Sequence, residues 1–165
     1  MTEELFDVCD ADDRVIGQER RSIVHAKGLL HRAVHIWVFR SSGTLVVHLR
    51  STTKDEYPSC YTSSASGHLG VGESYESAAH RELDEELGIS GELSYVTKLP
   101  AGPETAREHT VLYLIETDEP LTPDPGEIAG VEEWNIDELA ARLRESPERF
   151  TPPFRSLVTW WLQNR

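Results

Sequence analysis

Short apolar runs separated by polar turns predict most of the strands of this chain. Residues 34–39 are rich in β-branched and aromatic side chains, and residues 45–49 resume this character after Ser41, Ser42 and Gly43. Two such runs on either side of a short polar turn are typical of a β-hairpin. Further strands are predicted in a strand–turn segment at residues 6–15 and at residues 93–99, 110–116 and 131–135.

Helical periodicity predicts three helices, over residues 74–87, 136–144 and 154–163. In the first of them, Ala79, Leu83 and Leu87 form one apolar stripe that should pack on a sheet. Ser74 suits the N-cap of this helix, because its hydroxyl can accept a backbone hydrogen bond, and Gly88 suits its C-terminal end.

The elements follow one another without an internal repeat or a low-complexity linker. Residues 51–72 are mostly small or polar residues, Gly and Pro, which predicts a loop with short strands. A chain of 165 residues is long enough to bury its own core and is typical of one domain. We therefore predict a single α/β domain over residues 1–165, with helices able to cover both faces of a sheet.

The charge and composition of the chain indicate which kinds of partner it can bind. The net charge is −13, and such a surface repels nucleic-acid phosphates and anionic lipids. There is no run of about 18 apolar residues, the N-terminus does not resemble a signal peptide, and Cys9 and Cys60 form no CxxC pair. We expect a cytoplasmic protein without a nucleic-acid polymer or a membrane as partner, and leave a homodimer open. A phosphorylated small molecule would require a local cation.

Acidic side chains gather on one edge of the predicted helix at residues 74–87. Glu82 and Glu86 are four residues apart and share a stripe, with Glu85 beside them. Like charges at this spacing destabilise a helix, and the helix dipole disfavours negative charge near the C-terminus. A bound divalent cation would relieve both effects, because hard cations prefer several oxygen ligands. The alternative is a solvated acidic face on which Arg81 pairs with Glu85.

The spacing around this helix resembles the signature of a known family. Gly67 is followed after five residues by Glu73, and after seven more by Arg81-Glu-Leu-Asp-Glu-Glu-Leu-Gly-Ile89. This segment is similar at every defined position to the Nudix box, G-x5-E-x7-R-E-U-x-E-E-x-G-U, where U is aliphatic. The resemblance implies an α/β/α sandwich around a mixed β-sheet, with the box as loop, helix and loop. It also implies an enzyme that hydrolyses a diphosphate linkage.

The resemblance further implies roles for the residues of the box. The implied ligands of one or more Mg²⁺ or Mn²⁺ ions are the Gly67 carbonyl, Glu82, Glu85 and Glu86. Glu85 and Glu86 are also candidate catalytic residues, while Glu73 and Arg81 would orient the ligands, with Arg81 bound to Glu85. The ions would offset charge on the diphosphate and activate a water that attacks phosphorus.

The general base in this family often comes from outside the box. Glu127, which lies before the predicted strand at residues 131–135, is our candidate catalytic base. Glu86 or a hydroxide on a second metal could do the same work. The alternative for Glu127 is the role of an ordinary loop carboxylate.

Similarity to one branch of the family extends along nearly the whole chain. Residues 15–17 and 28–33 resemble the start of type 1 isopentenyl-diphosphate isomerases and their hydrolase relatives. Residues 150–152 resemble the end of hydrolases of this branch. We accordingly expect a core at about residues 31–162, preceded by an N-terminal extension at residues 1–30.

This branch makes an isomerase the second hypothesis. Those isomerases use a metal site of three histidines and two glutamates, with a cysteine as catalytic acid or base. The histidines that could match, or that could instead make structural hydrogen bonds, are His25, His31 and His68. Glu108 could match one glutamate, but Thr110 follows two residues on, and Ser66 stands where the cysteine belongs. A hydroxyl is too weakly acidic to replace a thiol, so the intact box favours the hydrolase. A third hypothesis, a nucleotide-sensing module without activity, conflicts with the complete set of box glutamates.

The box is expected to bind the diphosphate and not the group attached to it. The residues that could bind substrate phosphate are Arg32, Arg50, Lys54, His68 and Arg107. Trp37, Tyr57 and Tyr61 could stack on a base, although core packing is the commoner use of an aromatic residue. We expect a nucleoside diphosphate derivative, a nucleoside di- or triphosphate, or a similar small metabolite.

Overall fold

The structure is a computed structural model that describes residues 3–165. Its central layer is a mixed sheet of seven strands in the order β5-β4-β3-β8-β7, with β6 beside β3 and β9 beside β4. One half of the sheet is built on β3 (His31–Phe39), which runs parallel to β8 (Glu108–Glu116). β7 (Ser94–Leu99) is antiparallel to β8, and β6 (Ala65–His68) is antiparallel to β3.

The other half of the sheet is built on β4 (Leu45–Arg50), which separates from β3 after the pair Phe39 and Leu45. β4 then pairs with β9 (Ile128–Trp134) and with the short strand β5 (Tyr61–Thr62). The predicted hairpin is therefore present, but its strands stay paired only at the turn. Beyond that point β6 takes the place beside β3.

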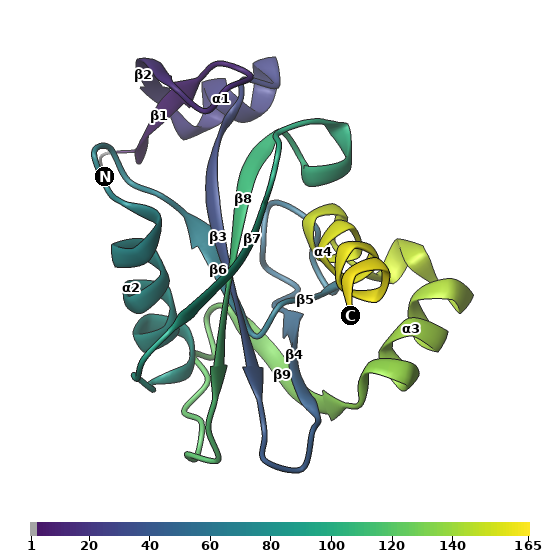
Figure 1. Cartoon of the computed structure of the whole chain (residues 1–165). Coiled ribbons are helices and arrows are strands. Elements are labelled where there is room, and N and C mark those ends of the chain that lie inside the picture. The colour runs from purple at the N-terminus through teal and green to yellow at the C-terminus, as the bar shows by residue number, and fades with distance from the viewer. Residues whose placement is uncertain (1–2) are drawn as a thin grey trace.

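Helices cover both faces of the sheet, as predicted, and form an α/β/α sandwich (Figure 1). α2 (Tyr75–Leu87) packs its predicted apolar stripe against one face, where it meets Val34 of β3. α4 (Pro152–Asn164) covers the opposite face, where it meets Trp37 of β3. α3 (Ile136–Glu145) lies beside α4. Because alternate residues of a strand point to opposite faces, β3 is buried on both sides.

The central helix begins and ends where the sequence predicts. The Ser74 hydroxyl accepts a hydrogen bond from the backbone of Ser77, and Gly88 closes the helix in the left-handed conformation, with φ 67°. The other predicted strands and helices are present with small shifts at their ends. Two short 3₁₀ helices, η1 (Pro103–Thr105) and η2 (Pro147–Arg149), complete the chain.

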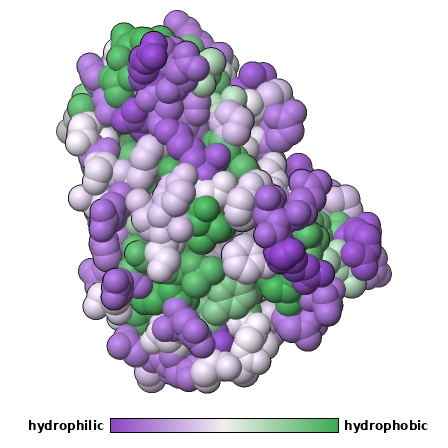
Figure 2. Space-filling view, in the orientation of Figure 1, coloured by the Kyte–Doolittle hydropathy of each residue, from purple (hydrophilic) through white to green (hydrophobic). Residues whose placement is uncertain are grey.

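An N-terminal unit lies at the top of Figure 1. It consists of the hairpin β1 (Leu5–Cys9) and β2 (Val15–Arg20), followed by α1 (Arg21–Lys27). The sequence did not predict α1, because Val24 is its one buried residue and no apolar stripe marks the helix. On the face shown in Figure 2, this unit presents hydrophilic and hydrophobic residues side by side. Within residues 3–165, no helix is both long and apolar enough to cross a membrane.

Asp13, in the turn between β1 and β2, ties the N-terminal unit to the rest of the protein. Its carboxylate accepts hydrogen bonds from Arg32 Nε at 2.7 Å, from the Tyr75 hydroxyl at 2.8 Å and from Lys98 Nζ. Burial alone would raise the pKa of Asp13, but these three donors outweigh it and lower the pKa to about 2. One side chain thereby joins the unit to β3, α2 and β7.

Candidate active site

A cavity of about 420 Å³ lies where β3 and β4 separate, and α2 forms one of its walls. Glu82, Glu85 and Glu86 all line it, so the three carboxylates that share one helix edge do face a common space. Gly67 and His68 of β6 line the same cavity.

Two of these carboxylates are largely buried. Glu86 is 5% exposed, and the Glu82 side chain is 12% exposed. Burial raises the pKa of Glu82 to about 7, although Arg81 lies beside it. Burial and repulsion from Glu82 raise the pKa of Glu86 well above its ordinary value. A bound cation would stabilise the ionised form of both.

Backbone atoms of β6 approach the two buried carboxylates closely. A Cβ atom at Gly67 would lie 2.2 Å from Oε1 of Glu82, so a side chain cannot occupy this position without displacing the carboxylate. The backbone N–H of Ser66 donates to Oε1 of Glu86 at 2.8 Å. The donor set offered here, carboxylates and a backbone carbonyl, consists of hard oxygen atoms and therefore fits Mg²⁺ or Mn²⁺.

Arg81 holds the loop that precedes α2 against the helix. Its Nε and Nη2 each donate to a different oxygen of Glu73 at 2.8 Å, and its Nη1 donates to Glu82 at 2.7 Å. The predicted pair with Glu85 is present as a longer contact of 3.3 Å. Glu73 also accepts from the backbone N–H of Gly70 at 3.0 Å. The main partner of Arg81 is therefore Glu73, with Glu82 next.

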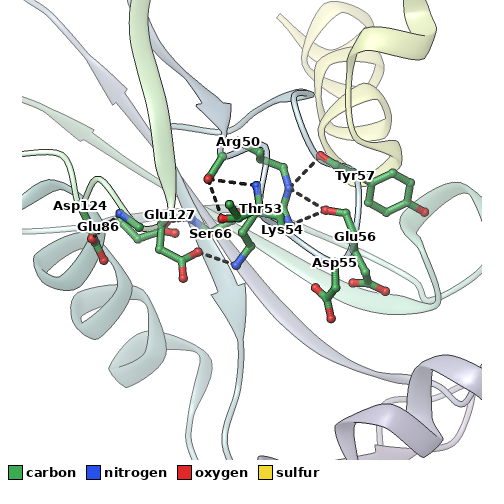
Figure 3. Close-up of polar contacts among 12 residues, drawn as sticks. Arg50, Thr53, Lys54, Asp55, Glu56, Tyr57, Ser66, Glu86, Asp124 and Glu127 are labelled. Atoms are coloured by element: carbon green, nitrogen blue, oxygen red, sulfur yellow. Dashed lines mark hydrogen bonds and ion pairs between the residues drawn. The ribbon is translucent and has the colours of Figure 1, made fainter.

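A second acidic segment, before β9, reaches the cavity from outside the box. Glu127 Oε2 lies 2.6 Å from Lys54 Nζ (Figure 3). Asp124 also lines the cavity, and its backbone N–H donates to the Glu86 carbonyl at 2.9 Å. Sequence reasoning identified Glu127 and Lys54 but missed Asp124, because no spacing rule connects this loop to the end of α2.

Arg50 lines the cavity, but its guanidinium is bound by the loop that follows it (Figure 3). It donates to the backbone carbonyls of Glu56 at 2.8 Å and Tyr57 at 3.2 Å. Tyr57 has φ 48°, a strained value for a bulky residue, and is 40% exposed. Trp37 is wholly buried and Tyr61 packs in the aromatic core. Tyr57 is therefore the aromatic side chain, of the three considered, that the fold leaves available for stacking at the cavity.

Two of the predicted phosphate-binding residues lie elsewhere. Arg32 is bound to Asp13 and is not part of the cavity lining found among residues 3–165. Its contact with substrate stays a prediction, and in this structure its charge is already neutralised by the carboxylate of Asp13. Arg107 lines a neighbouring cavity of about 370 Å³ together with His25 and His31.

His25, His31 and His68 form a cluster in which one ring nitrogen of each lies within 4.8 Å of the others. Glu108 Oε2 is 2.6 Å from Nε2 of His68 and 3.6 Å from Nε2 of His31. Burial alone would raise the pKa of Glu108, but His68 and His31 outweigh it and hold the pKa well below its ordinary value. Nε2 of His25 and Nε2 of His31 are buried and have no hydrogen-bond partner in the described chain. The cluster therefore still offers two nitrogens to a metal ion.

Ser66 and Thr110 carry hydroxyl side chains at the two positions where an isomerase was expected to have a cysteine and a second glutamate. Ser66 lines the cavity next to Gly67, and the Thr110 hydroxyl donates to the Glu108 carbonyl at 3.0 Å. Cys9 is buried in β1, and Cys60 donates its thiol hydrogen to the Glu148 carbonyl. For the part of the chain that the structure covers, the cavity lining includes no thiol.

Known proteins share both the sequence and the fold. Residues 29–154 match the NUDIX domain. The chain is 34% identical over 161 residues to isopentenyl-diphosphate Delta-isomerase of Serratia proteamaculans. This match covers 94% of this chain and 90% of that protein. It is 46% identical over 89 residues to an uncharacterized Nudix hydrolase of Streptomyces coelicolor. That match covers 54% of this chain and spans about half, 49%, of the relative's length.

A solved structure extends the likeness to the whole fold. The crystal structure of DR0079 from Deinococcus radiodurans has a TM-score of 0.83 and 25% sequence identity, over 94% of this chain and 98% of that one. The relatives thus include Nudix hydrolases as well as isopentenyl-diphosphate isomerases. With its intact box and its α/β/α sandwich, the chain belongs to the NUDIX domain family.

Proposed function

We propose that this protein is a metal-dependent hydrolase that cleaves a phosphoanhydride bond in a nucleoside diphosphate-linked compound or a nucleoside di- or triphosphate. The observation that carries the proposal is the convergence of the box carboxylates with Arg50 and Lys54 on one cavity. Groups that bind a divalent cation and groups that bind phosphate then face the same small molecule. The net charge of −13 disfavours a nucleic-acid polymer in that place.

The residues that would hold Mg²⁺ or Mn²⁺ are Glu82, Glu85, Glu86 and the Gly67 carbonyl. Such an ion, when bound, would offset the charge of the diphosphate. It would also lower the pKa of a water, so that the water can lose a proton near neutral pH and attack phosphorus. Arg81 positions Glu82, and Glu73 in turn fixes Arg81. The N–H of Ser66 engages one oxygen of Glu86, which leaves the other for the cation.

A carboxylate of the cavity, Glu127 or Glu86, would accept the proton of the attacking water. As the water oxygen bonds to phosphorus, the bridging P–O bond breaks, and a phosphate and a shortened phosphoryl compound leave. Glu127 is bound to Lys54 at 2.6 Å. It would become free to act as a base once Lys54 turns to a substrate phosphate. Lys54 would then exchange one anionic partner for another.

An isopentenyl-diphosphate isomerase is the second candidate. The observation that favours it is the histidine cluster, in which two ring nitrogens have no hydrogen-bond partner among the described residues, together with isomerase relatives that match most of the chain. The hydroxyls of Ser66 and Thr110 argue against it, because neither can exchange a proton with an alkene as a thiol or a carboxylic acid can. We rank the hydrolase first and a nucleotide-sensing module without activity third.

A release assay for phosphate and diphosphate, run over nucleoside di- and triphosphates and nucleoside diphosphate sugars with Mg²⁺ or Mn²⁺, tests this ranking. We expect metal-dependent turnover of at least one class. Isopentenyl diphosphate in the same buffers should yield no dimethylallyl diphosphate. Formation of that product without turnover of any nucleotide would put the isomerase first.

A further inference from the structure

One part of the cavity wall is polar but carries no charged group. It is formed by His35, Thr62 and Thr151, which are 3%, 1% and 4% exposed. The hydroxyls of Thr62 and Thr151 lie 3.0 Å apart. Thr151 precedes α4, which begins with Pro152 and Pro153, and its hydroxyl makes no capping hydrogen bond. The hydrogen bond that the structure gives the Thr151 hydroxyl is therefore the one with Thr62.

The hydrogen positions around His35 follow from its partners. Ser63 Oγ lies 2.9 Å from Trp37 Nε1, which can only donate, and 2.6 Å from His35 Nδ1. Ser63 is fully buried, and over residues 3–165 its hydroxyl has no other hydrogen-bond partner. The Ser63 hydrogen therefore goes to Nδ1, and His35 carries its own hydrogen on Nε2. Burial lowers the pKa of His35 to about 4, which keeps the ring neutral at pH 7.

This Nε2–H is directed to the cavity. Nε2 of His48 is sealed from solvent without a partner, whereas Nε2 of His35 is open to the cavity and has no hydrogen bond elsewhere in the described chain. The wall thus presents an uncharged N–H donor beside a pair of hydroxyls that can both donate and accept. Its complement is an uncharged group rich in oxygen atoms. An apolar chain there would leave buried polar groups unpaired, which is unfavourable.

The wall lies one strand away from the box carboxylates. His35 pairs with Ser66 across β3 and β6, and the Ser66 N–H donates to Glu86. Paired residues on antiparallel strands have Cα atoms about 5 Å apart. Because the wall and the carboxylates line the same cavity, a group attached to the diphosphate can reach the wall.

We propose that His35, Thr62 and Thr151 form a sugar subsite that binds the hydroxyls of a ribose joined to the diphosphate. The inference rests on the proposed function, because the box carboxylates and their cation must first hold the diphosphate. It adds the residues that bind the sugar of such a substrate.

The test measures binding to the full chain by calorimetry in saturating Mg²⁺, with analogues whose bridging oxygen is a methylene group and which cannot be hydrolysed. The probes are methylenediphosphonate, α,β-methylene-ADP and its 2′,3′-dideoxy form. We expect α,β-methylene-ADP to bind about 5- to 10-fold more tightly than its dideoxy form, as for the loss of a hydrogen bond between uncharged groups. Equal binding of the two nucleotides overturns the subsite. Failure of methylenediphosphonate to bind overturns the proposed function as well, so the two failures are distinguishable.

The protein side is tested with the double variant Thr62→Val/Thr151→Val, which keeps the shape and removes both hydroxyls together. We expect it to bind the ribose analogue about as weakly as the dideoxy form and to bind methylenediphosphonate normally. His35→Phe should act in the same direction. The matched control is Thr159→Val, the same change on the exposed side of α4, which should bind all three probes as wild type does. An equal loss for methylenediphosphonate in the double variant contradicts the subsite.

Discussion

Two buried glutamates face the same cavity in opposite electrostatic surroundings. Burial raises the pKa of Glu82 to about 7 and outweighs Arg81, with Glu85 adding to the rise. Burial also acts on Glu108, but His68 and His31 outweigh it and hold its pKa well below the ordinary value. Burial raises the pKa of both groups, and the difference between them comes from the neighbours, because only Glu108 has cationic partners that outweigh its burial.

The two sides of the cavity differ in whether the chain supplies enough positive charge for the carboxylates. The histidine side already contains its counter-charge in Glu108, 2.6 Å from His68. The box side places Glu82 and Glu86 together with Arg81 as the nearest cation. A divalent cation therefore gains more from the box than from the histidine cluster, where it would compete with an existing ion pair.

The largest expected effect comes from breaking the box side. Glu86→Gln should lower kcat by at least about 100-fold with little change in fold, because it removes a charge from the metal ligands. Steady-state kinetics and circular dichroism check this. Asp84→Asn, the same kind of change at an exposed position of α2, should retain full activity. Full turnover by Glu86→Gln would contradict the metal role.

Glu127 is an intermediate case, since it lies on the acidic side but has its own cation, Lys54. Glu127→Gln should slow the chemical step by about 10- to 100-fold at saturating Mg²⁺, as for the loss of a general base. The pH dependence of kcat should lose its acidic limb. An unchanged pH–rate profile would instead assign the proton transfer to Glu86.

The two glutamates should also give the stability of the metal-free protein opposite pH dependences. The pKa of Glu82 is raised from 4.5 to about 7, so the folded state binds the proton more tightly and the stability from this group falls as pH rises between these values. At about 1.4 kcal/mol per unit, the loss is roughly 3 kcal/mol. Urea unfolding at pH 5 and pH 7.5 measures it, and Glu82→Gln or added Mg²⁺ should remove it.

Glu108 should behave in the opposite way. Its folded pKa is lowered, so its contribution is present above the ordinary carboxyl pKa and is lost as pH falls through the lowered value. Glu108→Gln should therefore destabilise the protein at pH 7.5, where Glu82→Gln should stabilise it in the absence of metal. Equal signs for the two variants would contradict the comparison.

The smallest expected effect on activity is that of Arg32→Gln. This side chain lies outside the cavity, so KM should stay within about twofold of wild type, while the free energy of unfolding falls by roughly 1–3 kcal/mol because Asp13 loses one of its three donors. Arg50→Gln should raise KM by a larger factor, since Arg50 lines the cavity. A rise in KM for Arg32→Gln without a rise for Arg50→Gln would indicate that Arg32 contacts the substrate.

The features that the sequence predicted are those that depend on local spacing. The stripe of α2, its cap at Ser74 and the edge shared by Glu82 and Glu86 all follow from 3.6 residues per turn. The bond between Arg81 and Glu73 was not predicted, because Glu73 lies in the loop before the helix, where helical spacing does not apply.

Features assembled from distant segments were beyond the reach of local spacing. The hydrogen bond from Ser63 to His35 joins residues 28 apart, and His35 stands in a run that reads simply as a buried strand. The nearness of His25, His31 and His68 was suggested only by family resemblance, since they lie on α1, β3 and β6. Such contacts depend on topology, which pattern reasoning does not supply.

The anchoring of the N-terminal unit by Asp13 has a practical consequence for anyone trimming this protein. The family match begins at residue 29, so a fragment cut to that boundary would lose Asp13 and His25 together. Arg32, Lys98 and Tyr75 would then lose their common acceptor, and the start of α2 around Tyr75 would be exposed. Such a fragment should be easily digested by proteases, and a lack of activity in it would say nothing about the chemistry of the full chain.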